Sequence, residues 1–357
     1  MSQTMLAAVY YGPEDLRIEE RPIPAVGPGD ALIRVISTGI CGTDLRIYHG
    51  GHRMYAPGVA RVPGHEVVGE VAALGSDVEG LKEGQRVFVA PNFGCGHCRQ
   101  CITGNNNRCA HYGAPGITLD GSFAEFMLVP AAAVRQGNLI PIDPAVDPAS
   151  AALIEPFACV LRGQQALNIT PLDVALIIGA GPIGIMHLMA ARLQGARRII
   201  LSEINPERAA QAALFGADRV VNPASEDLNA VVMEETQGEG ADVIIVAAPA
   251  HRAQEAAPRL AAIGGRISFF GGLPKDQPTI QLDSNLVHYR ELIITGSTAS
   301  STFDCWRAAS IVAAGRVDLS RLVSARLPLH QAVEGLRVAE SGRALKVILE
   351  PRGGTSP

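Results

Sequence analysis

The sequence lacks the features that mark membrane, secreted or nucleic-acid-binding proteins. None of its uninterrupted apolar runs approaches the ~18 residues that indicate a transmembrane helix. Its start has no basic segment followed by an apolar core, so we expect no signal peptide. The net charge of −5 gives no reason to expect nucleic acid or an anionic membrane as a partner. We therefore expect a cytoplasmic protein with neither kind of partner.

Aromatic and charged side chains are also few, at 4% and 18%, whereas hydrophobic residues make up 47% of the chain. This balance excludes a disordered chain, and 357 residues are enough for two domains with cores of their own. The seven cysteines do not resemble a disulfide framework. Four of them fall between residues 95 and 109, which favours metal binding in a reducing compartment.

The chain has two parts with different patterns of apolar residues. Residues 5–134 consist of short apolar runs separated by glycine and proline, typical of an all-β barrel or sandwich with functional loops. From about Leu153, strand-like runs alternate with helical spacing, which predicts a doubly wound parallel sheet. The expected strands are 174–178, 198–202, 220–221, 242–246, 266–270 and 291–295, and the expected helices include 209–215, 228–236 and 252–263. Beyond residue 301 we expect one more helix and a tail that returns to the first domain.

A glycine motif lies at the first turn of the alternating region. Gly179, Gly181 and Gly184 follow an expected strand and open a helix, with Pro182 and Ile183 in its first turn. Glycines let the backbone approach a pyrophosphate, whose charge then meets the helix N-terminus. The alternative is a tight strand-to-helix turn with no ligand.

An acidic residue stands near the spacing that this motif requires. Glu203, at the end of the next expected strand, would accept hydrogen bonds from the adenosine ribose and repel a 2′-phosphate. This predicts NAD rather than NADP, although Arg208 nearby would soften the preference.

Four metal-ligating side chains lie at glycine- or proline-flanked positions outside the cysteine cluster. Cys41 offers a thiolate, His65 an imidazole, and Glu66 and Glu155 offer carboxylates. We hypothesise a catalytic zinc bound by Cys41, His65 and either Glu66 or Glu155, with one coordination position open. For Glu155, which precedes Pro156, a carboxylate at a helix N-terminus is an equally good interpretation.

The clustered cysteines give the sharpest metal signal, with the spacing Cys95-x2-Cys98-x2-Cys101-x7-Cys109. Four thiolates complete a tetrahedral zinc shell, so this site would be structural. A [4Fe–4S] cluster is the rival interpretation, but nothing else in the chain indicates electron transfer.

These residues together resemble the medium-chain zinc alcohol dehydrogenase family, in its sorbitol/threonine dehydrogenase-like branch. The stretch Gly64-His65-Glu66-x2-Gly69-x5-Gly75-x2-Val78 matches that family's zinc signature, and the other motifs follow in the family's order from about residue 5 to 350. The resemblance implies a GroES-like catalytic domain (1–153 and 301–357), a Rossmann NAD-binding domain (154–300), and a cleft that holds zinc against nicotinamide.

The resemblance also implies individual roles. Cys41, His65 and Glu66 match the catalytic zinc ligands, and Glu155 matches a ligand or a close neighbour of the metal. Asp44 matches the residue that orients the ligating histidine, and Thr43 the hydroxyl that starts proton removal from the substrate.

Two departures from the family pattern stand out. Many relatives have a proton-relay histidine where this chain has Arg46, and His49 or His52 are the candidates to replace it. Polyol-oxidising relatives often place arginine and tyrosine where this chain reads Thr298-Ala299-Ser300, which argues against a sorbitol-like substrate.

The leading hypothesis is an enzyme with two zinc ions per chain that moves a hydride between NAD and a secondary alcohol. The substrate would be a polyol, a sugar-derived molecule or a hydroxy-amino acid. The alternatives are an L-threonine 3-dehydrogenase, an NADPH-preferring carbonyl reductase, and a zinc- and nucleotide-binding protein without turnover. Relatives lead us to expect a homodimer or a homotetramer.

Overall fold

The computed structural model describes residues 4–50, 54–55 and 58–351. The chain divides into two compact units. The split unit comprises Met1–Ala158 and Ser300–Pro357, and the inserted unit comprises Cys159–Ala299. Within the described ranges, no helix is both long enough and apolar enough to cross a membrane.

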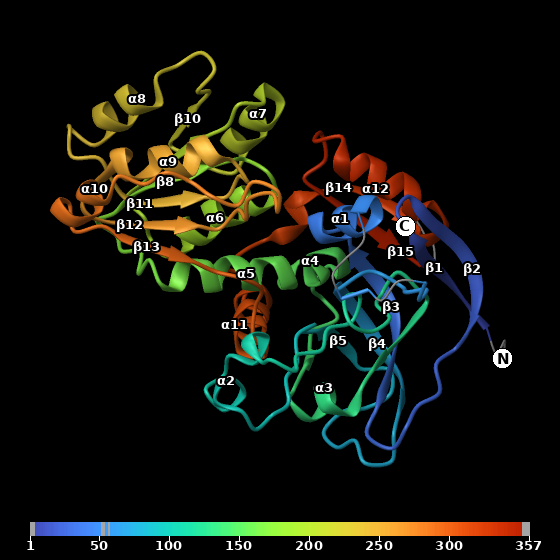
Figure 1. Ribbon diagram of the computed structural model, residues 1–357. Helices are drawn as coiled ribbons and strands as arrows, with labels where there is room; N and C mark the ends of the chain where they lie inside the picture. The colour runs from blue at the N-terminus through green and yellow to red at the C-terminus, as the bar shows by residue number, and fades with distance from the viewer. Residues whose placement is uncertain (1–3, 51–53, 56–57, 352–357) are drawn as a thin grey trace. The chain divides into compact units, whose positions relative to one another are not determined.

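The inserted unit alternates strands and helices along the chain (Figure 1). Its strands are β8 (Val174–Ile178), β9 (Arg198–Ser202), β10 (Arg219–Val221), β11 (Ala241–Val246), β12 (Ala261–Phe269) and β13 (Ile293–Gly296). Its helices are α6 (Pro182–Leu193), α7 (Pro206–Leu214), α8 (Leu228–Glu235), α9 (His251–Leu260) and α10 (Ser284–Tyr289). Helix α5 (Ile154–Gln165) precedes β8.

The six strands form one parallel sheet in the order β10-β9-β8-β11-β12-β13. All five residues of β8 are buried, as expected for the central strand of a sheet covered on both faces. Because crossovers between parallel strands are right-handed, α6 and α9 cover opposite faces of the sheet (Figure 1). The strand order reverses between β8 and β11, where ligands of such sheets bind. The predicted doubly wound fold is confirmed.

One predicted helix runs too far. We expected residues 252–263 to be helical, but α9 ends at Leu260 and Ala261 begins β12. Gly264 and Gly265 follow within the same strand, and Pro258 lies in the last turn of the helix. Helix-favouring alanines at 261 and 262 concealed this boundary, because pairing with β11 outweighs their propensity. Helix α7 is capped by Asn205, whose side chain accepts hydrogen bonds from the amides of residues 207 and 208.

The split unit is mainly β-structure. Its strands are β1 (Thr4–Gly12), β2 (Asp15–Pro22), β3 (Ala31–Gly39), β4 (Glu66–Leu74), β5 (Arg86–Val89), β6 (Phe126–Val129), β7 (Leu139–Pro141), β14 (Val323–Pro328) and β15 (Lys346–Glu350). Its helices are α1 (Gly42–Gly50), α2 (Arg99–Ile102), α3 (Ala131–Arg135), α4 (Pro148–Ala152), α11 (Thr302–Ala313) and α12 (Ala332–Glu340). Short 3-10 turns cover Asn106–Arg108, Leu319–Leu322 and Leu329–Gln331.

Both ends of the chain build the main sheet of this unit, in the order β14-β15-β3-β4-β5-β7. Strand β15 pairs antiparallel with the end of β3, which in turn pairs with the start of β4 (Figure 1). The tail therefore returns to the first part of the chain, as predicted. One apolar core packs around Ile33, Val67 and Val87 on these strands. A second core forms between β1, α1, α12 and β15.

The turn after β8 depends on one close backbone approach. A Cβ on Gly184 would lie 1.8 Å from the carbonyl oxygen of Gly179, whereas a Cβ on Gly181 would meet no atom within 4 Å. Gly184→Ala should therefore lower the free energy of unfolding by about 1–3 kcal/mol through overpacking. Thermal unfolding of the ligand-free protein measures this, with Gly181→Ala as the control whose melting temperature should not change. Equal melting temperatures of the two variants would contradict the close approach.

Candidate active site

The first turn of α1 presents three of the predicted site residues. Cys41 immediately precedes this helix, and the Asp44 carboxylate accepts a hydrogen bond from the Cys41 amide through Oδ2 (2.9 Å). An acidic side chain that reaches back to the amide preceding a helix closes its first turn, as in a capping box. Asp44 is buried and Thr43 half-buried. Local capping thus fixes the backbone that carries the Cys41 thiol.

Cys41 meets His65 and Glu66 across the sheet. One donor atom from each side chain lies within 4.8 Å of the others. Strand pairing explains the meeting, because Gly39 at the end of β3 lies opposite Glu66 at the start of β4. A Cβ on Gly39 would lie 2.1 Å from Glu66 Oε2, so only glycine leaves room for the carboxylate.

The buried His65 imidazole lies in a negative environment. Burial alone would lower the pKa of His65, but the charges of Asp44, Cys41 and Glu155, together with a hydrogen bond to Cys41, outweigh burial and raise that pKa well above its usual value. Burial in turn raises the pKa of Asp44, although His65 opposes the shift. His65 Nδ1 and Asp44 Oδ1 are 3.8 Å apart, and both are buried without a hydrogen-bond partner among the described residues. Asp44 thus faces the imidazole without a direct bond to it.

Glu66 has a cationic partner that the sequence analysis missed. Lys346 Nζ donates to both carboxylate oxygens of Glu66, at 2.7 and 2.5 Å, and to the carbonyl oxygen of Ile40 at 2.8 Å. The side chains are only 4% and 0% exposed. Burial would lower the pKa of Lys346, but the charges of Glu66, Cys41 and Glu155, together with the hydrogen bond to Glu66, more than offset this and raise it. A lone lysine in the apolar run 345–349 was the available signal.

Glu155 lies outside the compact donor set. Its buried carboxylate, in the first turn of α5, is not among the described residues whose donor atoms all fall within 4.8 Å of one another. It is near enough for its charge to raise the pKa values of His65 and Lys346. Of the two carboxylates that the sequence left open, the structure brings Glu66 to Cys41 and His65.

The relay position is occupied by a cation in contact with Thr43. Arg46 Nη2 donates to Thr43 Oγ1 at 3.1 Å. A guanidinium stays protonated, so Arg46 cannot accept a proton as histidine would. His49 contacts Glu340 (2.9 Å) and Glu14 (3.5 Å) instead, and both raise its pKa. The structure gives His49 no contact with Thr43, and His52 lies outside the described residues.

The four clustered cysteines predicted to bind zinc lie close together in the segment 95–109, which we call the cysteine lobe. The separations between their sulfur atoms include 3.5 Å for Cys98–Cys101, 3.8 Å for Cys98–Cys109 and 4.0 Å for Cys95–Cys101. The amides of Cys95 and His111 donate to Cys109 Sγ, both at 3.4 Å. The amides of His97 and Cys98 lower the pKa of Cys95 to about 6. Burial has the opposite effect on Cys101 and raises the pKa of its thiol to about 12.

Buried amide side chains anchor the cysteine lobe to the rest of the split unit. Asn106 Nδ2 donates to the Asn92 carbonyl (3.0 Å) and to Thr302 Oγ1 (2.7 Å), at the start of α11. Asn138 Nδ2 donates to the same Asn92 carbonyl at 2.8 Å. Asn92 Nδ2 donates to the Ser300 carbonyl at 2.9 Å. No local sequence pattern indicates this network, because its members lie up to 210 positions apart.

The glycine motif occupies the predicted place, after β8 and at the start of α6, with Pro182 and Ile183 in the first turn. Glu203 is nearly buried and already binds two backbone amides. Its Oε2 accepts from Ala180 N (2.6 Å) and its Oε1 from Asn205 N (2.8 Å). The carboxylate thus ties the glycine turn to the cap of α7. A ribose hydroxyl would have to use the remaining lone pairs of the carboxylate. Arg208, one turn into α7, is half-buried.

The donor chemistry fits two zinc ions. Four cysteine sulfurs match a closed tetrahedral shell, and the thiol, imidazole and carboxylate of the second cluster match a site that keeps one position open. The negative field around buried His65 is what a divalent cation would stabilise. Both sets of residues can therefore hold the metal.

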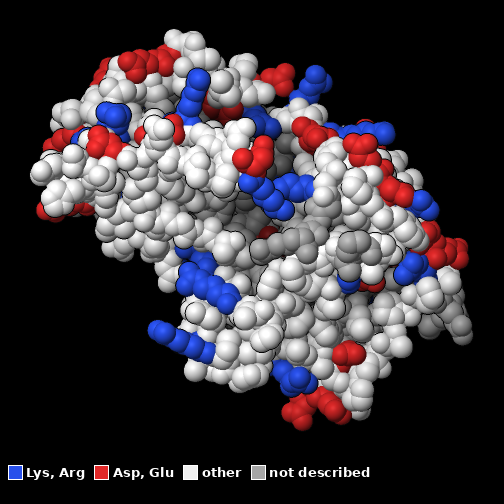
Figure 2. All heavy atoms as spheres, viewed as in Figure 1, with Lys and Arg blue, Asp and Glu red and all other residues white. Residues whose placement is uncertain are grey.

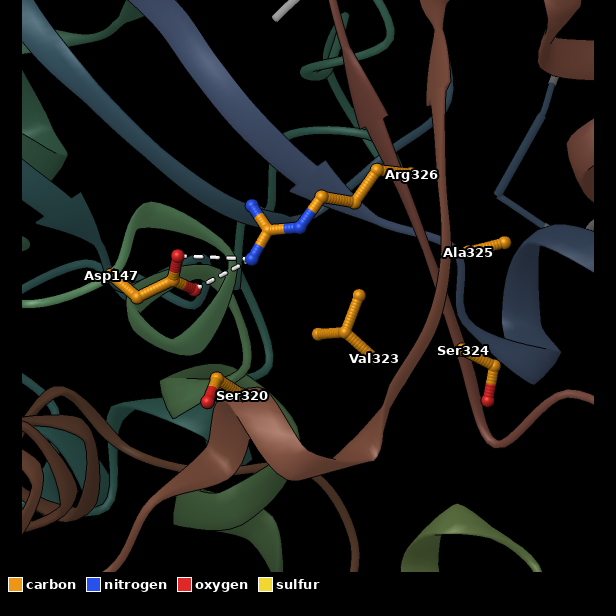
Figure 3. Close-up of a pocket in the computed structure, with 6 residues that line it drawn as sticks. All are labelled: Asp147, Ser320, Val323, Ser324, Ala325 and Arg326. Atoms are coloured by element: carbon orange, nitrogen blue, oxygen red, sulfur yellow. Dashed lines mark hydrogen bonds and ion pairs between the residues drawn. The ribbon is translucent and has the colours of Figure 1, made fainter. Parts of the chain in front are cut away.

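A separate surface hollow of about 340 Å³ lies beside β14. Figure 3 shows Arg326 in this hollow, directed at Asp147. Arg326 also pairs with Glu350 at 3.0 Å. Because two carboxylates already neutralise its cation, and the residues that line it include no thiol or imidazole, we assign no chemistry to this hollow.

The chain resembles known proteins over both units. Residues 27–140 match the family model "Alcohol dehydrogenase GroES-like domain", and residues 182–314 match the model "Zinc-binding dehydrogenase". L-threonine 3-dehydrogenase of Rhizobium rhizogenes is 34% identical and spans 98% of this chain and 99% of that protein. The chain belongs to the zinc-dependent medium-chain dehydrogenase family.

Solved structures agree with this assignment. A structure from Sinorhizobium meliloti, described as a zinc-binding dehydrogenase bound to NADP, has a TM-score of 0.88 and 31% identity, covering 98% of this chain and 99% of that one. An alcohol dehydrogenase of Escherichia coli complexed with NADH has a TM-score of 0.89 and 28% identity, with 98% and 100% covered. This medium-chain dehydrogenase is therefore a zinc- and NAD(P)-dependent enzyme with a GroES-like domain and a Rossmann sheet, as predicted.

Loss of one lobe thiolate should remove one metal ion. In Cys101→Ser we expect zinc to fall from about two ions per chain to about one, because a hydroxyl is a poor replacement for a thiolate. Metal analysis after dialysis measures the content, and limited proteolysis should cut within residues 95–109. Cys305→Ala, which alters a buried cysteine outside both clusters, is the control. Unchanged zinc in Cys101→Ser would contradict the structural site.

Loss of the buried lysine should destabilise the split unit. Lys346→Met leaves the Glu66 carboxylate buried without its counter-charge, which should cost about 3–5 kcal/mol of unfolding free energy. Urea denaturation of the zinc-free protein at neutral pH measures this, well below the raised pKa at which the lysine charge is lost. The double variant Lys346→Met/Glu66→Gln should recover part of the loss. Wild-type stability in Lys346→Met would show that the pair contributes nothing.

Proposed function

We propose that the enzyme oxidises a secondary alcohol with NAD, at the cluster formed by Cys41, His65 and Glu66. The observation that carries this proposal is the meeting of three different metal-ligating groups, Cys41 directly before α1 and His65 and Glu66 at the start of β4, with Thr43 in the first turn of α1. When bound, zinc supplies a Lewis acid that lowers the pKa of an alcohol, and nicotinamide supplies the hydride acceptor.

The chain's own residues would position the reactants and move the proton. Cys41 and His65 would hold the metal, with Glu66 as the third ligand and Glu155 as the nearby carboxylate that can replace it. Asp44 would keep the imidazole in place. Thr43 would accept the alcohol proton on one lone pair while it accepts the Arg46 hydrogen bond on the other, and would pass its own proton to water.

The nucleotide would bind in the inserted unit, which we propose as the Rossmann domain (154–300), with the catalytic domain formed by 1–153 and 301–357. The N-terminus of α6 favours the pyrophosphate, with Gly179, Gly181, Pro182, Ile183 and Gly184 around it. Glu203 would face the adenosine ribose and favour NAD over NADP, and Arg208 would lie close by. The NADP-bound relative from Sinorhizobium meliloti makes this preference the point to test.

The substrate class that we favour is a hydroxy-amino acid or a sugar-derived alcohol. Relatives named L-threonine 3-dehydrogenase, at 33 to 35% identity, support L-threonine. Residues 298–300 lack the arginine and tyrosine of polyol-oxidising relatives. A carbonyl reductase that prefers NADPH, and a zinc- and nucleotide-binding protein without turnover, are the competing functions.

We propose a cytoplasmic enzyme, because free lobe thiols require a reducing compartment. We also propose a homodimer or a homotetramer, as in the family. On the face seen in Figure 2, acidic and basic side chains are interspersed, which gives no support to a nucleic-acid partner.

A substrate panel combined with a Thr43 variant tests the function. NADH formation is followed with L-threonine, sugar acids and polyols, and Thr43→Val should lower kcat about 100-fold because the proton acceptor is lost. Thr43→Ser keeps the hydroxyl and should retain most activity. Full turnover by Thr43→Val would refute the role of Thr43. A two-zinc protein that turns over no alcohol would instead support binding without catalysis.

A further inference from the structure

Arg46 places an unpaired positive charge next to the reacting group. Its guanidinium is exposed and contacts Thr43 Oγ1, and it forms no ion pair with any residue that the structure describes. Other arginines of the split unit do have acidic partners, such as Arg34 with Glu70 and Arg326 with Asp147. A cation left without a partner beside a reaction centre is available to a ligand.

Helix stability does not explain this position. Side chains on a helix point toward its N-terminus, so the charge of Arg46 is directed toward the N-terminal end of α1. This end lies between Cys41 and Thr43. The helix dipole makes that end positive, which disfavours a cation by about 0.3–1 kcal/mol. The arginine therefore sits where its charge is of no benefit to the helix.

The local charges make Arg46 attractive to an anion. Glu66 is already neutralised by Lys346, and Asp44 is buried beneath the first turn of α1, facing His65. The remaining N–H groups of the guanidinium form a planar fork that matches a carboxylate in a bidentate pair. A substrate oxygen bonded to Thr43 would lie two successive hydrogen bonds, about 6 Å at most, from this fork. That spacing fits a substrate whose carboxylate is attached to the carbon that bears the reacting hydroxyl, or to the next carbon along.

We propose that Arg46 binds the carboxylate of the substrate and selects α- and β-hydroxy acids over neutral alcohols. This inference rests on the proposed function, since it requires the reacting hydroxyl to meet Thr43. Arg46 is then a specificity-determining residue that positions the substrate through its acid group. An arginine in place of the proton-accepting histidine would remove the proton relay at this position and provide a binding site for an anion.

Matched acid and amide substrates isolate this contact. 3-Hydroxybutyrate and L-threonine are each compared with their amides, which keep the shape and lose the charge. In the wild-type enzyme kcat/KM should favour each acid by about ten-fold or more, chiefly through KM, as expected for a charge-assisted hydrogen bond. Arg46→Gln should bring the ratio of acid to amide close to one, and Arg46→Lys should restore part of it.

The control is Arg337→Gln, an exposed arginine on α12 that pairs with Glu334 and should leave the acid-to-amide ratio unchanged. Calorimetric binding of the same four compounds to the zinc-loaded enzyme with NADH gives a second readout that does not need turnover. Acid-selective binding that disappears in Arg46→Gln supports the inference even if no substrate turns over, a result that would refute only the proposed function.

Two results would overturn the assignment of Arg46. Turnover of neutral alcohols and amides as fast as of acids would keep the proposed function and refute the acid selectivity. An acid preference that survives unchanged in Arg46→Gln would place the carboxylate site elsewhere in the protein.

Discussion

The buried pair of Glu66 and Lys346 is the constraint on which the split unit depends. A buried carboxylate beside a buried imidazole and a half-buried thiol would be strongly destabilised unless a cation neutralised it. Lys346 supplies that cation from the last strand of the chain, 280 positions away. The antiparallel pairing of β15 with β3 brings the lysine there, and Gly39 leaves the space for the carboxylate. The return of the C-terminal segment is therefore part of the chemistry of the site as well as of the fold.

The two metal-ligating clusters differ in their ligands and in what holds the ligands in place. The four lobe cysteines lie close enough to complete one coordination shell, and the amides of His97 and Cys98 lower the pKa of Cys95. Such a site needs nothing from the rest of the protein except an anchor, which Asn92, Asn106 and Asn138 provide. Among the residues that the structure describes, the second cluster has three close donors and a counter-charge held against one of them. A zinc ion bound there would compete with Lys346 for Glu66, which would leave Glu155 as the alternative carboxylate.

Sequence reasoning reached what is encoded locally. The spacing of the four cysteines and the glycine turn after β8 both depend on neighbouring residues, and both lie where they were predicted. Lys346, the asparagine network and the amide partners of Glu203 depend on pairings between distant strands, which no local pattern contains. The end of α9 was misplaced for the same reason, because β11 decides it rather than the alanines at the boundary. The choice between Glu66 and Glu155 likewise needed the register of β3 and β4.

In the reaction that we propose, arginine at position 46 would change the electrostatics as well as the selectivity. A histidine there could take up the proton that Thr43 would receive, whereas a guanidinium cannot, so the proton would have to leave through the half-exposed Thr43 hydroxyl to water. The permanent charge would compensate for this loss, because a cation within two hydrogen bonds of the alcohol oxygen would stabilise the negative charge that develops there. A substrate carboxylate bound to Arg46 would neutralise part of the positive charge that stabilises the alcohol oxygen. The same contact would orient the substrate. The arrangement therefore suits an enzyme with an anionic substrate, because the same arginine would bind the substrate and help to activate the substrate hydroxyl.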